Sequence, residues 1–310
     1  MKGPHDDPDA IVLLAGGRGS RFGGLKQRAP VGPAGEPLAA YTLHDAAAAG
    51  IGRAVVVCPP GMGQRLRREL GDFAPPALSL QAAEQANLPA RARPWGTAHA
   101  LLAAADALGT APFVVANADD FYGRAAIASA AAALVAGATE PGAPAAERHA
   151  VVAYRLERTM AETDRVSRAR CLIEGDRLVR LEERFDVRRR PDGRYRARAA
   201  DGTEDVLEPD APVSMNLWAF RPSILAGLRR GWSAFLEGGP RDAEEFMIPD
   251  AVNRAIRGGA EVRVVRTDAL AFGITTKADL GRARAVLVRL VASGAYPADL
   301  RGDAGRAASP

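Results

Sequence analysis

The residues best suited to chemistry lie between positions 14 and 27, in the sequence LAGGRGSRFGGLKQ. This segment follows an apolar run, Ala10–Leu14, which predicts a buried strand. Glycines carry no Cβ atom, so backbone N–H groups can approach an anion closely, and basic side chains in the same loop add positive charge. The glycines together with Arg21 and Lys26 therefore predict a site for a polyphosphate.

Two common phosphate-binding loops do not fit the spacing of this segment. Gly17 and Gly19 match the first two glycines of the dinucleotide fingerprint G-x-G-x-x-G, but Phe22 occupies the position of the third glycine. The Walker loop G-x-x-x-x-G-K-[ST] requires lysine directly after its last glycine, but Leu25 follows Gly24. A solvated surface loop is the structural alternative, and such a loop has no need of so many small residues just after a buried strand.

The segment resembles the signature of the nucleotidyltransferases that join a nucleoside triphosphate to a sugar phosphate or a similar acceptor. Their pattern is L-A-G-G-x-G-[ST]-R-[LMF], then lysine, then Pro-Val or Pro-Leu, and Leu14–Phe22, Lys26 and Pro30-Val31 follow it. The separation of Arg21 and Lys26 is similar to the compact loop of the cytidylyltransferase and molybdopterin-guanylyl branches. The resemblance implies that Arg21 and Lys26 are catalytic, and that the nucleotide contacts Leu14, Ala15, Gly16, Gly17, Gly19 and Ser20.

Two adjacent carboxylates, Asp119 and Asp120, follow a predicted strand at Pro112–Ala116. Mg²⁺ needs few protein oxygens when phosphates supply the other ligands. The run resembles the family's [GA]-D segment, which implies that Asp119 is catalytic and holds Mg²⁺ (or Mn²⁺), with Asp120 as a second ligand beside it. Alternatively, these carboxylates belong to a turn or cap the helix predicted from Arg124.

The sequence WGTAHALL resembles the family's G-T-A-x-A-L element, which implies that Gly96 and Thr97 face the nucleotide. In relatives a glutamine upstream bonds to the edge of the base, so Gln85 is the expected base reader. An amide can both donate and accept hydrogen bonds, as a base edge requires. An ordinary loop glutamine is the alternative for Gln85, and His99 is expected on the helix surface or behind the nucleotide-contacting residues.

The resemblance also implies contacts to the acceptor farther along the chain. The segment LEERF resembles L-E-E-K-P, which assigns Glu183 and Arg184 to the acceptor, with an ion pair at a strand edge as the alternative. The strand PVSMNLWAF resembles a strand in which glycine stands at the position of Asn216. We expect Asn216 and Asn117 to contribute to the acceptor site.

One departure from the family concerns the metal. Relatives of the thymidylyltransferase type carry a late W-x-D-x-G-T run whose aspartate is the second Mg²⁺ ligand, and here Gly273 falls at that position in AFGITT. The metal then depends on Asp119, Asp120 and the phosphates, or on Asp268 or Asp279. The same departure leaves open a relative that binds nucleotides or sugar nucleotides without turnover. A dehydrogenase-like cofactor domain is a third reading, which the missing third glycine disfavours.

Composition places few further restrictions on the function. The 310 residues are 47% apolar, and the formal charge of +4 suits an anionic substrate but does not indicate nucleic acid. Cys58 and Cys171 form no C-x-x-C motif, and two reduced thiols suit the cytoplasm. We expect an NTP and a phosphorylated small molecule as partners, no membrane or nucleic acid, and the oligomeric state stays open. The basic run Arg188–Arg198 is either a solvated hairpin or a lid.

Strands and helices alternate in the first half of the chain. The predicted strands are Ala10–Leu14, Arg53–Cys58, Leu78–Ala82, Pro112–Ala116 and His149–Leu156, and the helices are Pro37–Ala49, Gly63–Leu70, Thr97–Leu108 and Arg124–Ala136. The second half predicts an antiparallel ribbon, Ala169–Glu183 with Tyr195–Leu207, turning at Pro191-Asp192-Gly193, then strands Pro212–Phe220 and Glu261–Arg266 and helices Arg221–Leu236, Ala243–Arg257 and Thr276–Ser293.

This order predicts an α/β fold: a Rossmann-like, doubly wound, mostly parallel sheet with helices on both faces and an antiparallel elaboration on the acceptor side. We expect a flexible N-terminus at 1–9 and one domain at 10–293. The domain consists of a nucleotide-binding half at 10–160 and an acceptor-binding half at 161–293, and a C-terminal tail follows at 294–310. In such sheets, ligands bind beyond the carboxyl ends of the strands.

Overall fold

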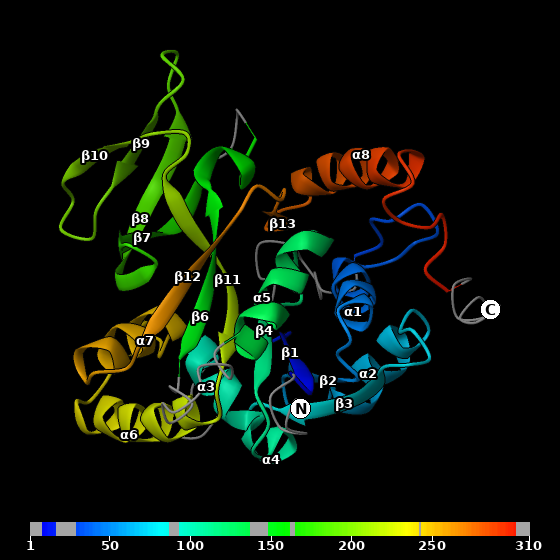
Figure 1. The fold of residues 1–310 in the computed structure, drawn as a ribbon, viewed down its shortest axis with the longest axis horizontal. Coiled ribbons are helices and arrows are strands. Elements are labelled where there is room, and N and C mark those ends of the chain that lie inside the picture. Colours follow the sequence, from blue (N-terminus) through cyan, green and yellow to red (C-terminus); the bar gives the residue numbers. More distant parts are fainter. Residues whose placement is uncertain are drawn as a thin grey trace.

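A mixed sheet of eleven strands crosses the protein, and Figure 1 shows it with helices packed around it. The computed structural model describes residues 8–16, 29–86, 93–136, 148–161, 165–241 and 243–301. Along the sheet the order is β10-β9-β8-β12-β6-β11-β4-β1-β2-β3, and β7 pairs with both β8 and β11. A separate two-stranded ladder joins β5 to β13.

The elements have the following bounds. The strands are β1 Ala10–Leu14, β2 Arg53–Cys58, β3 Ser79–Glu84, β4 Phe113–Asn117, β5 Asp120–Phe121, β6 His149–Arg155, β7 Val166–Glu174, β8 Arg177–Arg189, β9 Tyr195–Arg198, β10 Glu204–Leu207, β11 Pro212–Phe220, β12 Val262–Thr267 and β13 Phe272–Gly273. The helices are α1 Leu38–Ala48, α2 Gly63–Gly71, α3 Thr97–Ala103, α4 Ala105–Leu108, α5 Arg124–Ala136, α6 Ser223–Glu237, α7 Ile248–Arg257 and α8 Ala278–Ala292.

The predicted parallel arrangement is correct for the first half of the chain. Strands β3, β2, β1 and β4 are all parallel neighbours, and β6 is parallel to β12. Strand β11 lies between β4 and β6 and is antiparallel to both, and β7, β8, β9 and β10 pair antiparallel. The sheet as a whole is therefore mixed and not mostly parallel. In the β7–β10 part the antiparallel pairing follows from the short turns, which can join only antiparallel neighbours.

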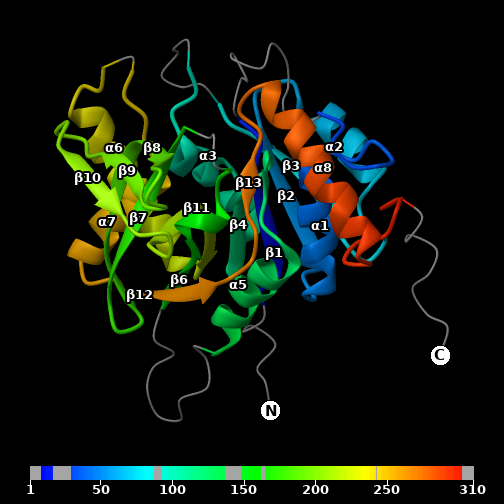
Figure 2. The same cartoon turned by 90° about the horizontal axis from the view of Figure 1, so that it is seen from above.

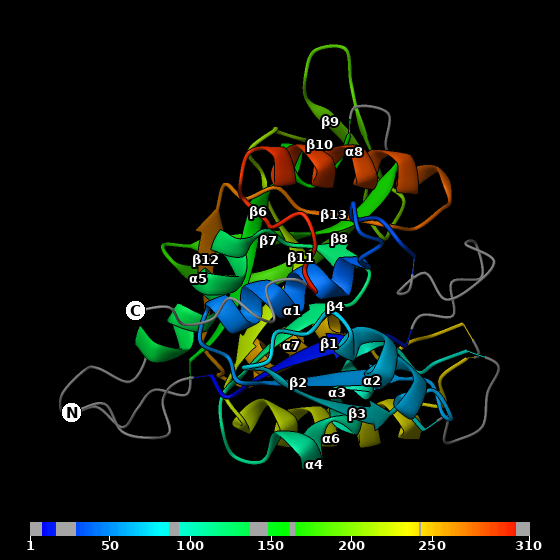
Figure 3. The ribbon, with the colours of Figure 1, turned by 90° about the vertical axis from the view of Figure 1, so that its right-hand side faces the viewer.

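Helices cover both faces of the sheet because its central strands place apolar side chains on both faces. Successive side chains of a strand point to opposite faces. Val12 and Leu14 of β1 pack in a core cluster with residues of α3, α4, α6 and α7, whereas Ile11 and Leu13 pack with α1, α2 and α5. Figure 3 shows α1 on one side of β1–β3 and α3, α4 and α6 on the other. Within the described ranges, none of the helices has both the length and the apolar composition of a membrane span.

Two predicted helices differ from the observed ones. The helix expected at Thr97–Leu108 is interrupted at Ala104, which separates α3 from α4. The helix expected from Ala243 begins only at Ile248, next to a proline in its first turn. Before it, the backbone of Phe246 donates to the carbonyl of Trp95 and accepts from Ala98 N. These bonds hold the residues before Ile248 in a non-helical conformation, although the sequence pattern there indicates a helix.

The antiparallel ribbon has more turns than we expected. The predicted turn at Pro191-Asp192-Gly193 is confirmed, because Gly193 has φ +85° and Arg190 N donates to Arg194 O. Further turns at Gly175 and Gly202 also have positive φ, at +63° and +87°. The two expected segments are therefore four strands, β7 to β10, which Figure 1 shows at one end of the sheet.

The chain after α8 packs against α1. Tyr296 and Leu300 are buried, although we expected a tail from residue 294. The hydroxyl of Tyr296 donates to Asp45 Oδ2 at 2.6 Å, and Leu300 N donates to the buried carboxylate of Glu36. Figure 2 shows α8 and the following segment beside α1. Residues 294–301 thus belong to the packed structure, because their apolar and polar groups both find partners there.

We predict that Tyr296→Phe lowers the free energy of unfolding by about 1.5–3 kcal/mol, the usual contribution of a hydrogen bond to a charged group. Asp45 is buried at 2% exposure, so it cannot replace the lost donor fully with water. Urea denaturation with an unchanged m-value measures the effect. Ser293→Ala removes only an exposed cap to Leu290 and is the control. Equal midpoints for the two variants would mean that residues 294–301 lie outside the cooperative unit.

Candidate functional site

Three predicted site residues lie at the edge of the sheet where parallel strands end. Gly16 follows β1, Gln85 follows β3, and Asn117 is the last residue of β4. Because β1, β2, β3 and β4 run parallel, these ends lie on one edge. Leu14 and Ala15 are buried, and Ala15 N donates to Val57 O at 2.7 Å. The other predicted residues of the glycine-rich loop lie outside the described residues: Gly17, Gly19, Ser20, Arg21 and Lys26.

Gln85 and two other residues predicted to bind the nucleotide, Gly16 and Gly96, lie next to one another. Gln85 N donates to Cys58 O at 2.8 Å, and the side chain is 5% exposed. Its Nε2 atom lies 3.2 Å from Gly96 O and 3.0 Å from His99 Nδ1. A Cβ atom on Gly16 would lie 2.8 Å from Gln85 Oε1. The end of β1, the end of β3 and the start of α3 are therefore in contact with one another through Gln85.

Gly96 is required by the backbone that packs against it. Its φ is +99°, and a Cβ atom there would lie 2.6 Å from the carbonyl oxygen of Phe246. Next to it, the Thr97 hydroxyl accepts a hydrogen bond from Ile248 N at 3.0 Å. Gly96 and Thr97 thus attach the segment before α7 to α3. The family motif assigned both residues to the nucleotide and gave no indication of this second role.

An aromatic cluster behind Gln85 was not predicted. The ring centroids of His99 and Trp232 are 4.4 Å apart, and Trp232 also packs edge-on against Trp95 and stacks on Phe235. Burial lowers the pKa of His99 to about 4, so the imidazole is neutral at pH 7. Trp232 and Phe235 are three residues apart on α6 and share one helix face, which was the available sequence signal.

The acidic part of the site lies on the β5–β13 ladder. Asp120 of β5 pairs with Gly273 of β13, and its Oδ2 atom accepts from Asn117 Nδ2 at 2.8 Å. A Cβ atom on Gly273 would overlap Asp120 Oδ1. A side chain at position 273, where the resemblance places an acidic residue, would therefore have to displace the Asp120 carboxylate. The carboxylate of the neighbouring strand fills that space.

Asn117 and Asn216, both predicted at the acceptor site, are linked in a chain of hydrogen bonds. Trp218 Nε1 donates to Asn216 Oδ1, Asn216 Nδ2 donates to Asn117 Oδ1, both at 2.7 Å, and Asn117 then donates to Asp120. Indole can only donate, and an ionised carboxylate can only accept, so both amide orientations are determined. Asn216 has φ +62° within the irregular stretch of β11, which is consistent with the glycine of relatives.

The other candidate metal ligands have different surroundings. Asp119 is half-buried, and its backbone oxygen accepts from Ile274 N at 3.0 Å. Asp279 Oδ2 accepts from Thr275 N and Thr276 N, so it holds the turn that precedes α8. Asp268 is mostly exposed and lies 3.7 Å from an arginine, Arg155. Within the described residues, no three His, Cys, Asp or Glu side chains are grouped to hold a metal.

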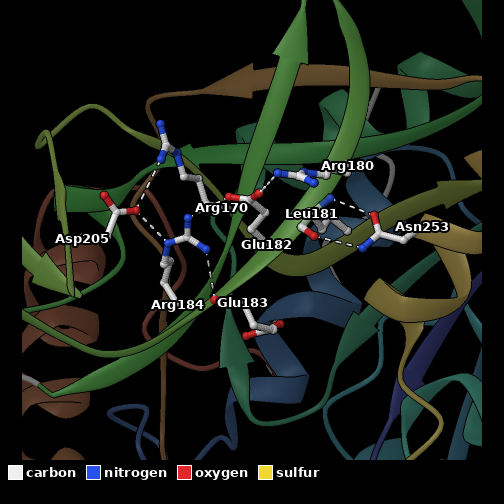
Figure 4. A network of polar contacts seen from close by, with 8 residues as sticks. All are labelled: Arg170, Arg180, Leu181, Glu182, Glu183, Arg184, Asp205 and Asn253. Carbon is white, nitrogen blue, oxygen red and sulfur yellow. Dashed lines mark hydrogen bonds and ion pairs between the residues drawn. The ribbon is translucent and has the colours of Figure 1, made fainter. Parts of the chain in front are cut away.

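Glu183 and Arg184 point to opposite faces of β8, as Figure 4 shows. Arg184 is paired with Asp205 at 2.8 Å and with Glu182 at 2.7 Å, and its side chain is 11% exposed. Burial and the nearby carboxylate of Asp250 raise the pKa of Glu183. One acceptor molecule cannot contact both side chains from one face. These contacts favour the ion-pair alternative for Arg184 and leave Glu183 as the acceptor candidate of the pair.

The basic run at 188–198 pairs largely with local carboxylates. Arg188 lies 2.7 Å from Asp186, and Arg194 lies 3.0 Å from Asp192. Asn253 of α7 makes a different contact to the same strand, because its amide bonds to both the N–H and the carbonyl of Leu181 (Figure 4). The ribbon is thus fixed to α7 at β8. The ion pairs of Arg188 and Arg194 favour the solvated hairpin over the lid for the basic run.

The fold is that of an α/β protein whose parallel strands end at one edge of the sheet. Residues 11–184 match the family described as MobA-like NTP transferase domain. This match covers more than half of the chain, and the protein belongs to that family. The predicted resemblance to nucleotidyltransferases is thereby confirmed, and the chain is an enzyme of the nucleotidyltransferase class.

Solved structures show the same fold over nearly the full chain. The inositol-1-phosphate CTP transferase from T. maritima is 14% identical, with a TM-score of 0.62, and the match covers 93% of this chain and 98% of that one. A putative glucose-1-phosphate thymidylyltransferase from Bacillus anthracis, in complex with a sucrose, is 16% identical, with a TM-score of 0.58 and coverage of 90% and 94%. A UDP-glucose pyrophosphorylase from Acinetobacter baumanii is 13% identical, with a TM-score of 0.57 and coverage of 92% and 99%. No curated protein sequence matches this chain.

We predict that Gly96→Ala destabilises the protein by about 3 kcal/mol or more, since a left-handed backbone strain of about 1–2 kcal/mol adds to the overlap with Phe246. Gly50→Ala is the matched control, because Gly50 has φ +85° but nothing within 4 Å of an added Cβ. Urea denaturation of both variants separates strain from overlap. Similar losses in the two variants would show that the contact with Phe246 is not a tight constraint.

Proposed function

We propose that this protein transfers a nucleoside monophosphate from an NTP to a sugar phosphate or a similar phosphorylated small molecule, with release of pyrophosphate. The observation that carries this proposal is the common edge. The nucleotidyltransferase signature begins at the end of β1, beside Gln85 on one side and the Asn117–Asp120 pair on the other. The family match and the names of the similar structures support the same reaction class.

In this reaction, an oxygen of the acceptor phosphate attacks the α-phosphorus, and the bond to the pyrophosphate oxygen breaks. No covalent enzyme intermediate is needed, so catalysis consists of positioning and charge neutralisation. Arg21 and Lys26 would bind the triphosphate and stabilise the leaving pyrophosphate. Gln85 would contact the base, and the side chains of Asn117, Asn216 and Glu183 would face the acceptor.

The carboxylates of Asp119 and Asp120 are the proposed ligands of Mg²⁺ or Mn²⁺. Their oxygens suit a hard cation, and the absent side chain at Gly273 leaves the Asp120 carboxylate in the space that an added side chain would need. A bound cation would neutralise charge on the phosphate oxygens. Because few protein ligands are available here, we expect tight metal binding only together with an NTP.

A catalytically weak, regulatory family member that binds nucleotides or sugar nucleotides is the second candidate, and the glycine at 273 is the observation that favours it. The position of Asp120 weakens the argument from Gly273, since a carboxylate is still present at the same place.

The buried thiols Cys58 and Cys171 support a reducing, cytoplasmic location. The shared core between β1, α6 and α7 supports one domain over residues 10–293.

A screen of the common NTPs against sugar 1-phosphates and other phosphorylated acceptors, with pyrophosphate release as the readout, tests the proposed reaction. We predict that Lys26→Ala lowers kcat/KM by on the order of 10²-fold or more, because one charged transition-state contact contributes a few kcal/mol. Lys26→Arg should restore only part of the rate, since a planar guanidinium does not replace a point charge. NTP binding with little or no pyrophosphate release for any acceptor would favour the catalytically weak candidate.

The metal site gives a further prediction. Gly273→Ala should displace the Asp120 carboxylate and weaken Mn²⁺ binding in the presence of a non-hydrolysable NTP by about tenfold, the smaller end of the effect of disturbing a ligand's surroundings. Asp119→Asn should weaken it more, because a charged ligand is lost. Calorimetric titration of Mn²⁺ with and without the nucleotide measures both effects.

The control for Gly273→Ala is Gly281→Ala in α8, where an added Cβ meets nothing within 4 Å. We expect this control to retain Mn²⁺ affinity and to gain slightly in helix stability. Unchanged Mn²⁺ affinity in folded Gly273→Ala would exclude Asp120 as a ligand. Tight binding without nucleotide would contradict the proposed two-carboxylate site.

A further inference from the structure

We propose that His99 fixes the orientation of the Gln85 amide so that its carbonyl oxygen faces the nucleotide, and that the base must therefore offer an N–H group at this place. The inference rests on the proposed nucleotide site and deepens it. His99 is a positioning residue in this view, because it acts on the ligand only through Gln85. The required ligand is a nucleoside triphosphate whose base carries a hydrogen-bond donor there.

The first step is the assignment of the two atoms of the amide group. The Gln85 atom assigned as Nε2 lies 3.2 Å from Gly96 O. A backbone carbonyl can only accept, so the atom facing it must be the nitrogen, and a flipped amide would bring two oxygens together. The Gly96 carbonyl is itself held in place by the close packing of Gly96 against Phe246.

The second step concerns the other hydrogen of the same nitrogen. His99 Nδ1 lies 3.0 Å from Gln85 Nε2 and can accept from it only when that ring nitrogen carries no proton. Burial lowers the pKa of His99 to about 4, in agreement with a neutral ring whose proton is on Nε2. Both hydrogens of the Gln85 amide are therefore engaged inside the protein.

The third step is the mechanical support of His99. Its ring is tilted by 40° against Trp232 at 4.4 Å, and Trp232 is itself packed against Trp95 and Phe246. Rings in such contact stabilise one another beyond the area that they bury. The imidazole is thus held between α3 and α6, and it cannot rotate away from Gln85 without disturbing this cluster.

What remains for a ligand is the Gln85 carbonyl oxygen. It lies on the side of Gly16, where a Cβ atom would approach it to 2.8 Å, and it accepts no hydrogen bond within the described part of the chain. Gly16 opens the glycine-rich segment, so the oxygen faces the proposed nucleotide. A carbonyl oxygen accepts and does not donate, and it therefore selects an imino or amino N–H of the base over a carbonyl or a ring nitrogen.

The test compares nucleotides that differ only in this N–H. Calorimetry measures binding of UTP against 3-methyl-UTP, CTP against N4,N4-dimethyl-CTP, ATP against N6,N6-dimethyl-ATP, and GTP against 1-methyl-GTP and N2,N2-dimethyl-GTP. The protein variants are His99→Phe, which keeps a ring beside Trp232 but offers no acceptor, and His99→Asn, whose side-chain oxygen can accept in place of Nδ1. The added methyl groups have the same bulk for all three proteins, so a difference in the methylation penalty reports the amide orientation.

We expect methylation of the preferred nucleotide to weaken binding at least tenfold for the wild type and for His99→Asn. In His99→Phe the penalty should fall about fivefold, the effect of one neutral hydrogen bond no longer holding the amide. Thermal unfolding confirms that each variant is folded. Equal penalties in all three proteins, or a methylated nucleotide that binds the wild type as well as its parent, would overturn the inference while leaving the proposed reaction intact. Absence of NTP binding to the wild type would overturn both.

Discussion

The close approach between Gly96 and the backbone of Phe246 is the constraint on which the nucleotide side of the structure depends. It joins the start of α3 to the segment before α7, although nearly 150 residues separate them in sequence. Its geometry directs the Gly96 carbonyl toward Gln85 and places His99 one turn farther along α3, against the aromatic residues of α6. The packing of Gly96 and His99 therefore depends on the second half of the chain folding onto the first.

A second set of contacts between the two halves of the chain positions the carboxylate of Asp120. Strand β11 comes from the second half, inserts beside β4, and brings Asn216 and Trp218 to the end of that strand. The resulting hydrogen bonds end on Asp120, a carboxylate that needs donors when it is partly removed from water. The indole at one end can only donate and the carboxylate at the other end can only accept. The hydrogen bonds of the two amides between them therefore all run in one direction and hold the carboxylate in one place.

The sequence predicted the parts of this structure that depend on local pattern. The apolar run at Ala10–Leu14 and the motif residues Gly16, Gln85 and Gly96 are local signals, and their common location follows from parallel strands. The contacts of Trp218 and Phe246 depend on which distant strands and segments become neighbours, and no local pattern records that. The divergence of Glu183 and Arg184 was predictable, since adjacent residues of a strand alternate between faces, but the family motif treated them as one unit.

The relation between Gly273 and Asp120 shows why a motif is better compared in the three-dimensional structure than in the sequence alone. In the sequence alone, glycine at 273 indicates the loss of a metal ligand. In the β5–β13 ladder, the residues at 120 and 273 are direct partners, and a side chain at 273 would displace the Asp120 carboxylate from its present position. Glycine on β13 leaves room for a carboxylate supplied from β5. The departure at 273 and the acid at 120 therefore form one feature, and neither residue can be interpreted without the other.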